Sequence, residues 1–290
     1  MQSSDPVIRN ISDTARWVAM FRANETDRAD AVFRDPFARV LAGERGAQIA
    51  ASMRRSARDE WPFVARTFLF DEFISREIAA GCDTVINLAA GLDARPYRMA
   101  LPPTLRWVEI DLPEILAEKE QILRGEKAAC AVERIPLDLR DVAARRAAFE
   151  RIAGTAKKVL VIAEGLIVYL DAGEVRSLAD DLARVPVFQR WVLDIGSPGL
   201  LRMMQRAVGR RLDAAGAPFK FAPAEGPAFF VPHGWRPTDV RSMLKTAAKL
   251  RRLPWFLRLM ALLPESKGPP GSRPWAGVCL LHKERGAEAH

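Results

Sequence analysis

Four short apolar runs, separated by helical stretches, constrain the fold of this chain more than any other feature. The runs are Thr84–Leu88, Leu105–Ile110, Val159–Ile162 and Trp191–Ile195. Strands that are apolar almost throughout are covered on both faces, and their alternation with helices is typical of a mostly parallel sheet. A last run, Gly277–Leu281, is expected to complete the sheet at its edge. We therefore predict an α/β fold with a doubly wound, mostly parallel, Rossmann-like sheet.

The pattern before Gly81 is helical. Phe70, Phe73, Ile74 and Ile78 lie at the spacing of one helix face, and Gly81 supplies a helix stop. Segment 1–80 is thus expected to be an N-terminal helical segment that precedes the sheet.

Segment 197–235 breaks the regular pattern, because prolines and glycines recur throughout it. It is predicted to be a lid or a substrate-facing insertion. We find no internal repeat or low-complexity linker, so residues 1–290 are interpreted as a single domain.

Charge permits several partners. Lys and Arg outnumber Asp and Glu by 44 to 36, and this net charge of +8 would attract nucleic acid, anionic lipid or an acidic partner. Many arginines, such as those in 143–148, are interpreted as solvated helix faces. Arg241, Lys245, Lys249 and Arg252 suggest a basic helical stripe, but no RNA-reading aromatic motif accompanies it, so a nucleic-acid partner is disfavoured.

The sequence lacks the features that membrane-spanning, secreted and metal-binding proteins require. No apolar run approaches the roughly 18 residues of a membrane span, and Trp255–Leu263 is broken by Arg258. The opening residues lack a secretory signal, which predicts a cytoplasmic protein. Cys82, Cys130 and Cys279 are far apart and have no histidines at metal-ligand spacing, so core thiols and no metal are expected.

Candidate site residues follow four consecutive strands, and the carboxyl ends of parallel strands are where such sheets bind ligands. A small-residue turn around Gly91 follows the first strand, and Asp111 lies twenty residues beyond it, the spacing of an acid that accepts hydrogen bonds from ribose hydroxyls. Asp138 and Leu139 come after a third strand, expected between the runs Leu105–Ile110 and Val159–Ile162, and could contact an adenine. Glu164 follows the fourth strand, with Tyr169 a few residues later.

Each candidate also has a simpler interpretation. Asp111 could cap the helix that begins at Leu112-Pro113-Glu114, and Asp138 competes with Asp141 for the next cap. Glu164 and Tyr169 could be satisfied polar groups at a strand end. The set favours a ligand site more than any member does, because all of its members lie at one edge of the predicted sheet.

Several separated motifs resemble the leucine carboxyl methyltransferase-like family of class I S-adenosylmethionine-dependent methyltransferases, which includes bacterial polyketide O-methyltransferases. The motifs are Ser12–Ala15, Phe33–Ala38, Asp83–Arg95, Val108–Pro113, Asp138–Asp141 and Ala163–Leu170. The resemblance implies a sheet that carries S-adenosylmethionine across its strand ends, with the N-terminal helices as a cap that closes over it.

The resemblance also assigns residues to the cofactor. Arg66 would meet its carboxylate, which suits the fork of a guanidinium. Gly91 would meet the methionine portion, Asp111 the ribose, and Asp138 with Leu139 the adenine.

Further assignments are less direct. Glu164 and Tyr169 would line the site near the transferred methyl group, and Arg22 would assist from the N-terminal helix. Ala89 stands where the family often has the first glycine of its turn, so Ala89 is expected to be strained if that position needs a positive φ. His233 is the one histidine within the irregular insertion, and a catalytic role is weighed for it against a structural one.

The resulting prediction is an O-methyltransferase that uses S-adenosylmethionine. Its acceptor would be a carboxylate or hydroxyl of a small, polyketide-like metabolite, free or bound to a carrier protein, and the scarcity of bases favours a carboxylate. The alternatives are an RNA or protein carboxyl methyltransferase and a non-catalytic relative that only binds the cofactor. A nicotinamide-dependent oxidoreductase is less favoured, because Ala89, Gly91 and Ala94 stand where Gly-x-Gly-x-x-Gly is required. The sequence leaves the oligomeric state open.

Overall fold

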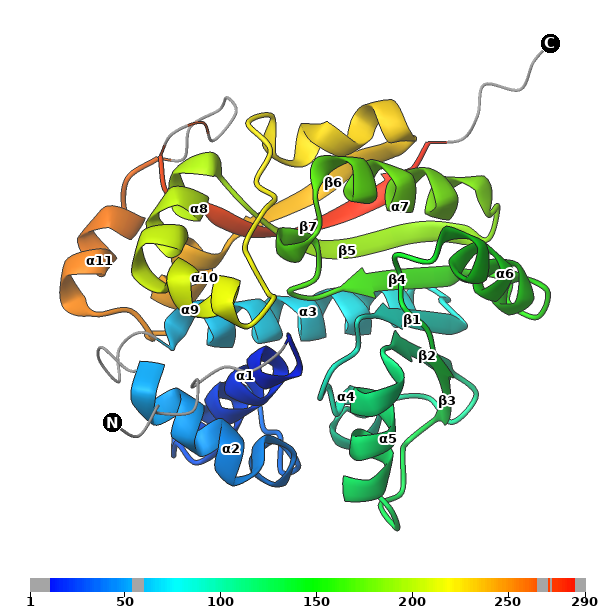
Figure 1. The fold of residues 1–290 in the computed structure, drawn as a ribbon, viewed down its shortest axis with the longest axis horizontal. Coiled ribbons are helices and arrows are strands. Elements are labelled where there is room, and N and C mark those ends of the chain that lie inside the picture. The colour runs from blue at the N-terminus through cyan, green and yellow to red at the C-terminus, as the bar shows by residue number, and fades with distance from the viewer. Residues whose placement is uncertain (1–10, 54–59, 265–270, 272, 285–290) are drawn as a thin grey trace.

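A seven-stranded sheet forms the centre of the computed structural model, which describes residues 11–53, 60–264, 271 and 273–284 (Figure 1). The strand order is β3-β2-β1-β4-β5-β7-β6. The strands are β1 Thr84–Leu88, β2 Arg106–Asp111, β3 Ala131–Pro136, β4 Val159–Ala163, β5 Phe188–Gly196, β6 Trp235–Ser242 and β7 Ala276–Lys283. The chain order reverses direction between β1 and β4, and this is where a doubly wound sheet opens a ligand crevice.

Helices cover both faces of the sheet. The α-helices are α1 Ile11–Thr26, α2 Ala38–Met53, α3 Trp61–Ala79, α4 Arg95–Arg98, α5 Pro113–Ile122, α6 Val142–Ala153, α7 Ala172–Arg184, α8 Pro198–Met204, α9 Arg210–Ala214, α10 Met243–Lys249 and α11 Trp255–Ala261. Shorter turns are η1 Ile167–Tyr169, η2 Gln205–Gly209 and η3 Gly226–His233. One apolar core joins α6, α7 and η3 to the sheet, and a second joins α3 and α10 to the opposite face.

The central strands are buried because successive side chains enter these two cores in turn. Val85 of β1 belongs to the core under α3, whereas its neighbour Ile86 belongs to the core under α6 and α7. In β4, Val161 and Ile162 divide in the same way. All residues of β1 and β4 are buried, which confirms the prediction of a doubly covered, mostly parallel sheet.

The helical pattern before Gly81 is also confirmed. The side chains of Phe70, Phe73 and Ile74 on α3 are buried against the sheet, and Gly81 ends the helix region with φ +91°. Helices α1 and α2 form a third apolar core with α5. In Figure 1 they lie beside the sheet, below α3.

The prediction that Gly277–Leu281 forms the edge of the sheet is wrong, although the segment is a strand. β7 pairs antiparallel with β5 on one side and with β6 on the other, so β6 forms the edge. The sequence pattern missed β6 because it is polar and contains Pro237, a residue that edge strands tolerate where central strands do not. Its register shifts between Pro237 and Asp239.

The predicted basic helical stripe is also wrong, because its first residue lies in β6 and not in a helix. Arg241 lies in β6, where it forms ion pairs with Glu72 and Asp239, and only Lys245 and Lys249 lie on α10. Arg252 follows α10 and pairs with Glu25 on α1 at 2.7 Å. These four residues therefore do not share one helix face.

The expectation for the arginines of 143–148 is wrong in part, whereas that for the cysteines is confirmed. The arginines of 143–148 are not all solvated, because Arg145 is buried and its guanidinium pairs with Asp181 of α7. All three cysteines are free and buried as expected, and burial raises the thiol pKa of Cys82 to about 12 and that of Cys130 to about 11. No helix among the described residues is long and apolar enough to cross a membrane.

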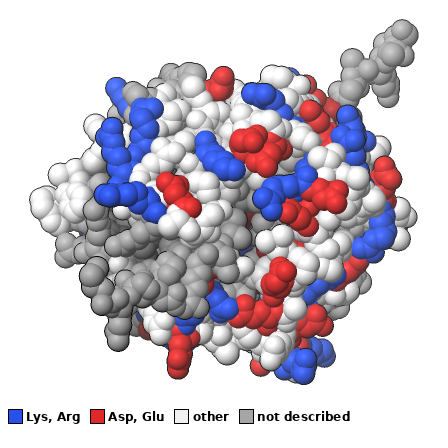
Figure 2. Space-filling view, viewed as in Figure 1, with Lys and Arg blue, Asp and Glu red and all other residues white. Residues whose placement is uncertain are grey.

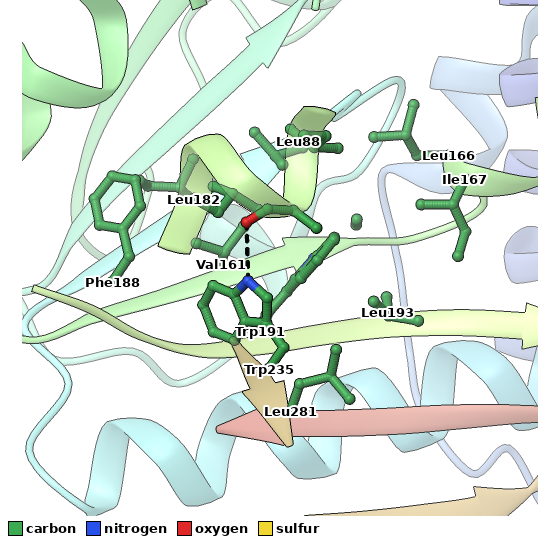
Figure 3. Close-up of a cluster of buried hydrophobic side chains, with 14 of the residues drawn as sticks. Leu88, Val161, Leu166, Ile167, Leu182, Phe188, Trp191, Leu193, Trp235 and Leu281 are labelled. Carbon is green, nitrogen blue, oxygen red and sulfur yellow. Dashed lines mark hydrogen bonds between the residues drawn. The ribbon is translucent and has the colours of Figure 1, made fainter. Parts of the chain in front are cut away.

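Trp235 anchors the edge strand to the helical layer. Its indole is fully buried beside Trp191, at 5.5 Å between ring centroids, and its Nε1 donates a hydrogen bond to the carbonyl oxygen of Ala179 at 3.0 Å (Figure 3). Phe188, Leu193 and other apolar side chains fill the surrounding core. One side chain thus ties β6 to α7.

We expect Trp235→Phe to lower the free energy of unfolding by about 1–3 kcal/mol, because the indole hydrogen bond to Ala179 is lost and the smaller ring leaves space in the core. Trp255→Phe is the matched control: Trp255 is 70% exposed, and its replacement should change stability by less than about 0.5 kcal/mol. Urea unfolding followed by circular dichroism measures both. Equal losses for the two variants would contradict the assigned role of the buried indole.

Candidate active site

A large cavity opens at the carboxyl ends of the central strands. Its volume is about 1810 Å³, and the strand ends, α1, α3 and the segment from α8 to η3 all line it. Residues from the predicted set that line it are Arg66, Ala89, Gly91, Asp111, Asp138, Leu139, Glu164 and Tyr169, together with Arg22. The fold therefore brings together eight of the nine site residues expected from the sequence.

The turn after β1 has the backbone geometry of a tight ligand-facing loop. Ala89 has φ +52° and Gly91 has φ +47°, so the expected strain at Ala89 is present. A Cβ atom on Gly91 would lie only 3.2 Å from the Cβ of Ala15 on α1. The position therefore needs glycine both for its conformation and for the close approach of α1.

Asp111 closes this turn against the end of β2. Its Oδ2 accepts a hydrogen bond from the Gly91 amide at 2.6 Å, and its Oδ1 accepts one from the Leu112 amide at 2.7 Å. Burial raises the carboxyl pKa, although both amides favour the carboxylate. Helix α5 has Leu112 as its N-cap and no side-chain cap, so the interpretation of Asp111 as a helix cap is wrong.

Arg95, which the sequence analysis did not single out, pairs with three carboxylates beneath the turn. Its guanidinium donates to Asp71 of α3, Asp93 of the turn and Glu164 after β4, each at 2.7 Å. Arg95 and its neighbours hold the pKa of Asp93 well below its ordinary value, although burial opposes this. The only sequence signal was an arginine inside the turn motif, which did not indicate three carboxylate partners.

Arg66 of α3 lies between two carboxylates on the cavity wall. Its Nε donates to Glu164 at 3.1 Å, and one terminal nitrogen lies 3.3 Å from Asp194, at the end of β5. Burial works against the charged form, but these carboxylates keep the pKa of Arg66 above its ordinary value. Burial also raises the pKa of Asp194, whose Oδ1 accepts the Gly165 amide at 2.5 Å.

The sequence analysis missed Asp194 as well. It stands one residue before the end of an apolar run, inside a predicted strand and not among the residues that follow one. Only the pairing of β5 with β4 brings its carboxylate next to Arg66 and Gly165.

Asp138, Leu139 and Tyr169 occupy different parts of the wall. Asp138 is partly exposed and pairs with Arg140, while Asp141 caps α6 by accepting the Ala144 amide. Tyr169 packs against Phe219 at 5.4 Å between ring centroids. Burial raises the pKa of Tyr169, so its hydroxyl stays protonated near neutral pH and can donate a hydrogen bond.

His233 does not belong with the other eight residues. It ends η3 outside the cavity wall, and its Nδ1 lies 2.7 Å from Asp180 on α7. The structural interpretation of this histidine therefore replaces the catalytic one. Among the described residues, no group of three or more His, Cys, Asp or Glu side chains is arranged to hold a metal ion.

Comparison with known proteins assigns the family. The model of the leucine carboxyl methyltransferase family matches residues 15–183, more than half of the chain. The chain belongs to the leucine carboxyl methyltransferase family. Two relatives are provisionally named as S-adenosyl-L-methionine-dependent methyltransferases. That of Frankia alni is 37% identical over 65% of this chain and 70% of its own length, and that of Streptomyces coelicolor is 31% identical over 89% and 92%.

Solved structures support the fold. A crystal structure from Thermobifida fusca, provisionally described as a methyltransferase, covers 97% of both chains with a TM-score of 0.60 and 13% identity. A DUF574 family protein from Streptomyces avermitilis covers 91% of this chain and 96% of its own, with a TM-score of 0.59 and 12% identity. Together with the family match, these findings establish a class I methyltransferase fold and an S-adenosyl-L-methionine-dependent methyltransferase.

The residues of the cavity fit this cofactor. The turn leaves no room for a side chain at Gly91, so the backbone of this residue lines the cavity directly. Asp111 offers carboxylate oxygens at the end of β2, where acids in such sheets accept ribose hydroxyls. Arg66 supplies a guanidinium that could pair with a carboxylate.

We expect Ala89→Gly to stabilise the protein by about 1 kcal/mol, because glycine adopts a positive φ without steric strain. The opposite change at the matched position, Gly91→Ala, should destabilise the protein, since it adds both strain and a contact with Ala15. Thermal unfolding of the two variants measures this. A lower melting temperature for Ala89→Gly would show that the Ala89 methyl contributes more than its backbone strain costs.

Proposed function

We propose that this methyltransferase transfers the methyl group to an oxygen, a carboxylate or hydroxyl, of a small and largely apolar organic metabolite. The observation that carries the proposal is the composition of the cavity. One end holds Gly91, Asp111 and Arg66, whereas the other is lined by apolar side chains of the segment from α8 to η3 and of α11. The volume of about 1810 Å³ exceeds the range of about 300–1,000 Å³ typical of single-ligand pockets, which suits a cofactor and a second, apolar molecule.

A carboxylate is the acceptor that these side chains suit best. It is ionised at neutral pH and needs no general base, whereas a hydroxyl would benefit from one. No histidine or cysteine stands among the described residues that line the cavity, and burial keeps Tyr169 protonated. The name of the family, leucine carboxyl methyltransferase, describes the same acceptor group.

We assign the cofactor contacts by position on the wall. Asp111 would accept the ribose hydroxyls, with Ala89 and Gly91 beside the methionine portion. Arg66 would pair with the cofactor carboxylate.

The remaining assignments complete the cofactor site. Asp138 and Leu139 would contact the adenine, and Glu164 would hold Arg66 and Arg95 in place near the reacting groups. When bound, S-adenosyl-L-methionine supplies an electrophilic methyl group that the acceptor oxygen takes up as the carbon–sulfur bond breaks. The task of the chain is then alignment of the oxygen with that methyl, which can lower the barrier by roughly 7–11 kcal/mol.

Two segments would enclose the site as a cap and a lid. Ser12, Thr14 and Trp17 of α1 line the cavity from one side, and the segment from α8 to η3 lines it from the other. Three free thiols suit a reducing compartment, so we retain a cytoplasmic location. A polyketide-like acceptor, free or carried by a protein, remains within this proposal.

Incubation with methyl-labelled S-adenosyl-L-methionine and a metabolite extract tests the proposed reaction. We expect the label in an apolar organic acid. Mild alkali should release it as methanol, because methyl esters hydrolyse where ethers do not. Label found only in precipitated RNA or protein, or on nitrogen, would refute the proposal. Binding of S-adenosyl-L-homocysteine without any transfer would instead identify a non-catalytic relative.

We expect Asp111→Asn to weaken S-adenosyl-L-homocysteine binding about ten- to a hundred-fold near neutral pH, the effect of losing a charged hydrogen-bond acceptor. Wild-type affinity should fall as the pH drops through the pKa of Asp111, because binding needs the carboxylate. Burial raises that pKa, so the fall should begin above the range of an ordinary aspartate.

Titration calorimetry across this pH range measures the effect. The control is Asp141→Asn, since Asp141 caps α6 outside the cavity wall and asparagine also caps. An Asp111→Asn variant with the pH profile of the wild type would remove Asp111 from the ribose site.

A further inference from the structure

Helix α11 presents its apolar side chains to solvent. Ten large apolar residues are exposed among those described, and six of them fall between 255 and 263. These six are Trp255, Phe256, Leu259, Met260, Leu262 and Leu263, with exposed fractions from 50% to 80%. At about 100° per residue, the four that lie on α11 fall on one half of the helix, whereas Leu257 and Ala261 face the protein.

The surface beside this helix is basic. The chain carries no acidic residue between Asp194 and Asp213, or between Asp239 and Glu265. Within the first interval Arg202, Arg206 and Arg210 recur every four residues along α8, η2 and the start of α9, and all three are exposed. Figure 2 shows Lys and Arg side chains gathered over this part of the molecule, beside an uncharged protrusion at its left edge.

Both elements border the cavity. Leu257, Met260 and Leu263 line it from α11 and the residues that follow, and Met203 and Met204 line it from α8. Figure 1 places α8, α9 and α11 at the same end of the molecule. The exposed apolar helix and the basic stripe therefore flank one apolar chamber.

We infer that α11 and the stripe of Arg202, Arg206 and Arg210 form a docking surface for an anionic lipid bilayer. The apolar half of α11 would enter the boundary between headgroups and acyl chains, with the arginines against the lipid phosphates. The acceptor would then be a lipophilic molecule that passes from the bilayer into the cavity. This last step rests on the proposed function, whereas the docking itself does not.

The combination of features selects a lipid surface over other anionic partners. Nucleic acid would account for the arginines, and for exposed aromatic rings through base stacking, but gives no reason to expose the aliphatic side chains of Leu259, Leu262 and Leu263 to water. A second copy of the chain, related by a twofold axis, would bring this basic surface against itself, which like charges oppose. An anionic lipid bilayer accommodates both features, because its acyl chains can receive the apolar side chains of α11 and its phosphates can pair with the arginines.

Co-sedimentation with phosphatidylcholine vesicles, with and without phosphatidylglycerol, tests the inference. We expect binding only when the anionic lipid is present. The double variant Arg206→Gln/Arg210→Gln should partition about 25-fold more weakly, at about five-fold for each arginine. The double variant Trp255→Ser/Leu259→Ser should weaken partitioning about ten-fold or more, because two apolar side chains no longer enter the lipid.

Matched controls separate this surface from the overall charge. Val40→Ser removes a 56% exposed apolar side chain on α2, and Arg151→Gln/Arg184→Gln removes two exposed charges on α6 and α7. Both should bind vesicles as the wild type does. All variants should retain affinity for S-adenosyl-L-homocysteine, which verifies that they are folded.

Three results would overturn the inference. Equal losses for the two arginine pairs would indicate diffuse charge. Full binding by the Trp255/Leu259 variant would indicate a purely electrostatic surface, such as one for RNA or an acidic protein. A dimer in sedimentation equilibrium that this variant abolishes would assign α11 to a second copy.

Vesicle binding needs no turnover, so these results are independent of whether a methylated acid is found. A water-soluble product from a lipid-bound enzyme would overturn only the acceptor step.

Discussion

The guanidinium of Arg95 is the constraint on which the rest of the site depends. Three elements that are distant in the sequence, α3, the turn after β1 and the end of β4, each contribute one carboxylate to it. Buried charges are stable only when their partners and hydrogen bonds are complete, so the three elements are held in one relative position. The helical segment, the turn and the strand end thereby become parts of one cavity wall.

This arrangement also explains the position of Arg66. Glu164 accepts a hydrogen bond from Arg95 with one oxygen and from Arg66 with the other. Arg95 therefore orients, through Glu164, the Arg66 side chain that we assign to the cofactor carboxylate. On the opposite side of the turn, Arg22 donates to the carbonyl oxygen of Leu92 at 2.5 Å and to Asp35 at 2.8 Å. The N-terminal helix therefore contacts the turn through the hydrogen bond from Arg22 to Leu92 as well as through Ala15.

The two ends of the cavity differ in how they are built. The cofactor end is formed by strand ends and a tight turn, which are fixed by sheet hydrogen bonds and buried ion pairs. The other end is formed by short helices that follow β5 and β6, with apolar side chains such as Met203, Met204 and Leu257. A rigid end suits the cofactor, and short apolar helices suit the apolar acceptor that we propose.

The sequence by itself determined the class of sheet, its apolar central strands and most of the predicted residues that line the cavity. The spacing and clustering of apolar residues are local properties, so apolar runs such as Val159–Ile162 identified strands. Residues directly after parallel strands were then expected to lie at one edge of the sheet. The family motifs then gave the cofactor. These signals need no knowledge of which segments meet.

Only the tertiary structure decided what depends on contacts between distant segments. Edge position lets β6 be polar and contain Pro237, so its sequence resembled a loop and a helix. His233 lies within the predicted lid segment, yet packing turns it towards Asp180. Arg95 and Asp194 gained their roles from carboxylates, a guanidinium and an amide supplied by other elements, and α11 is exposed because nothing among the described residues packs over its apolar half. Long-range pairing and burial are set by the whole fold, and no local pattern encodes them.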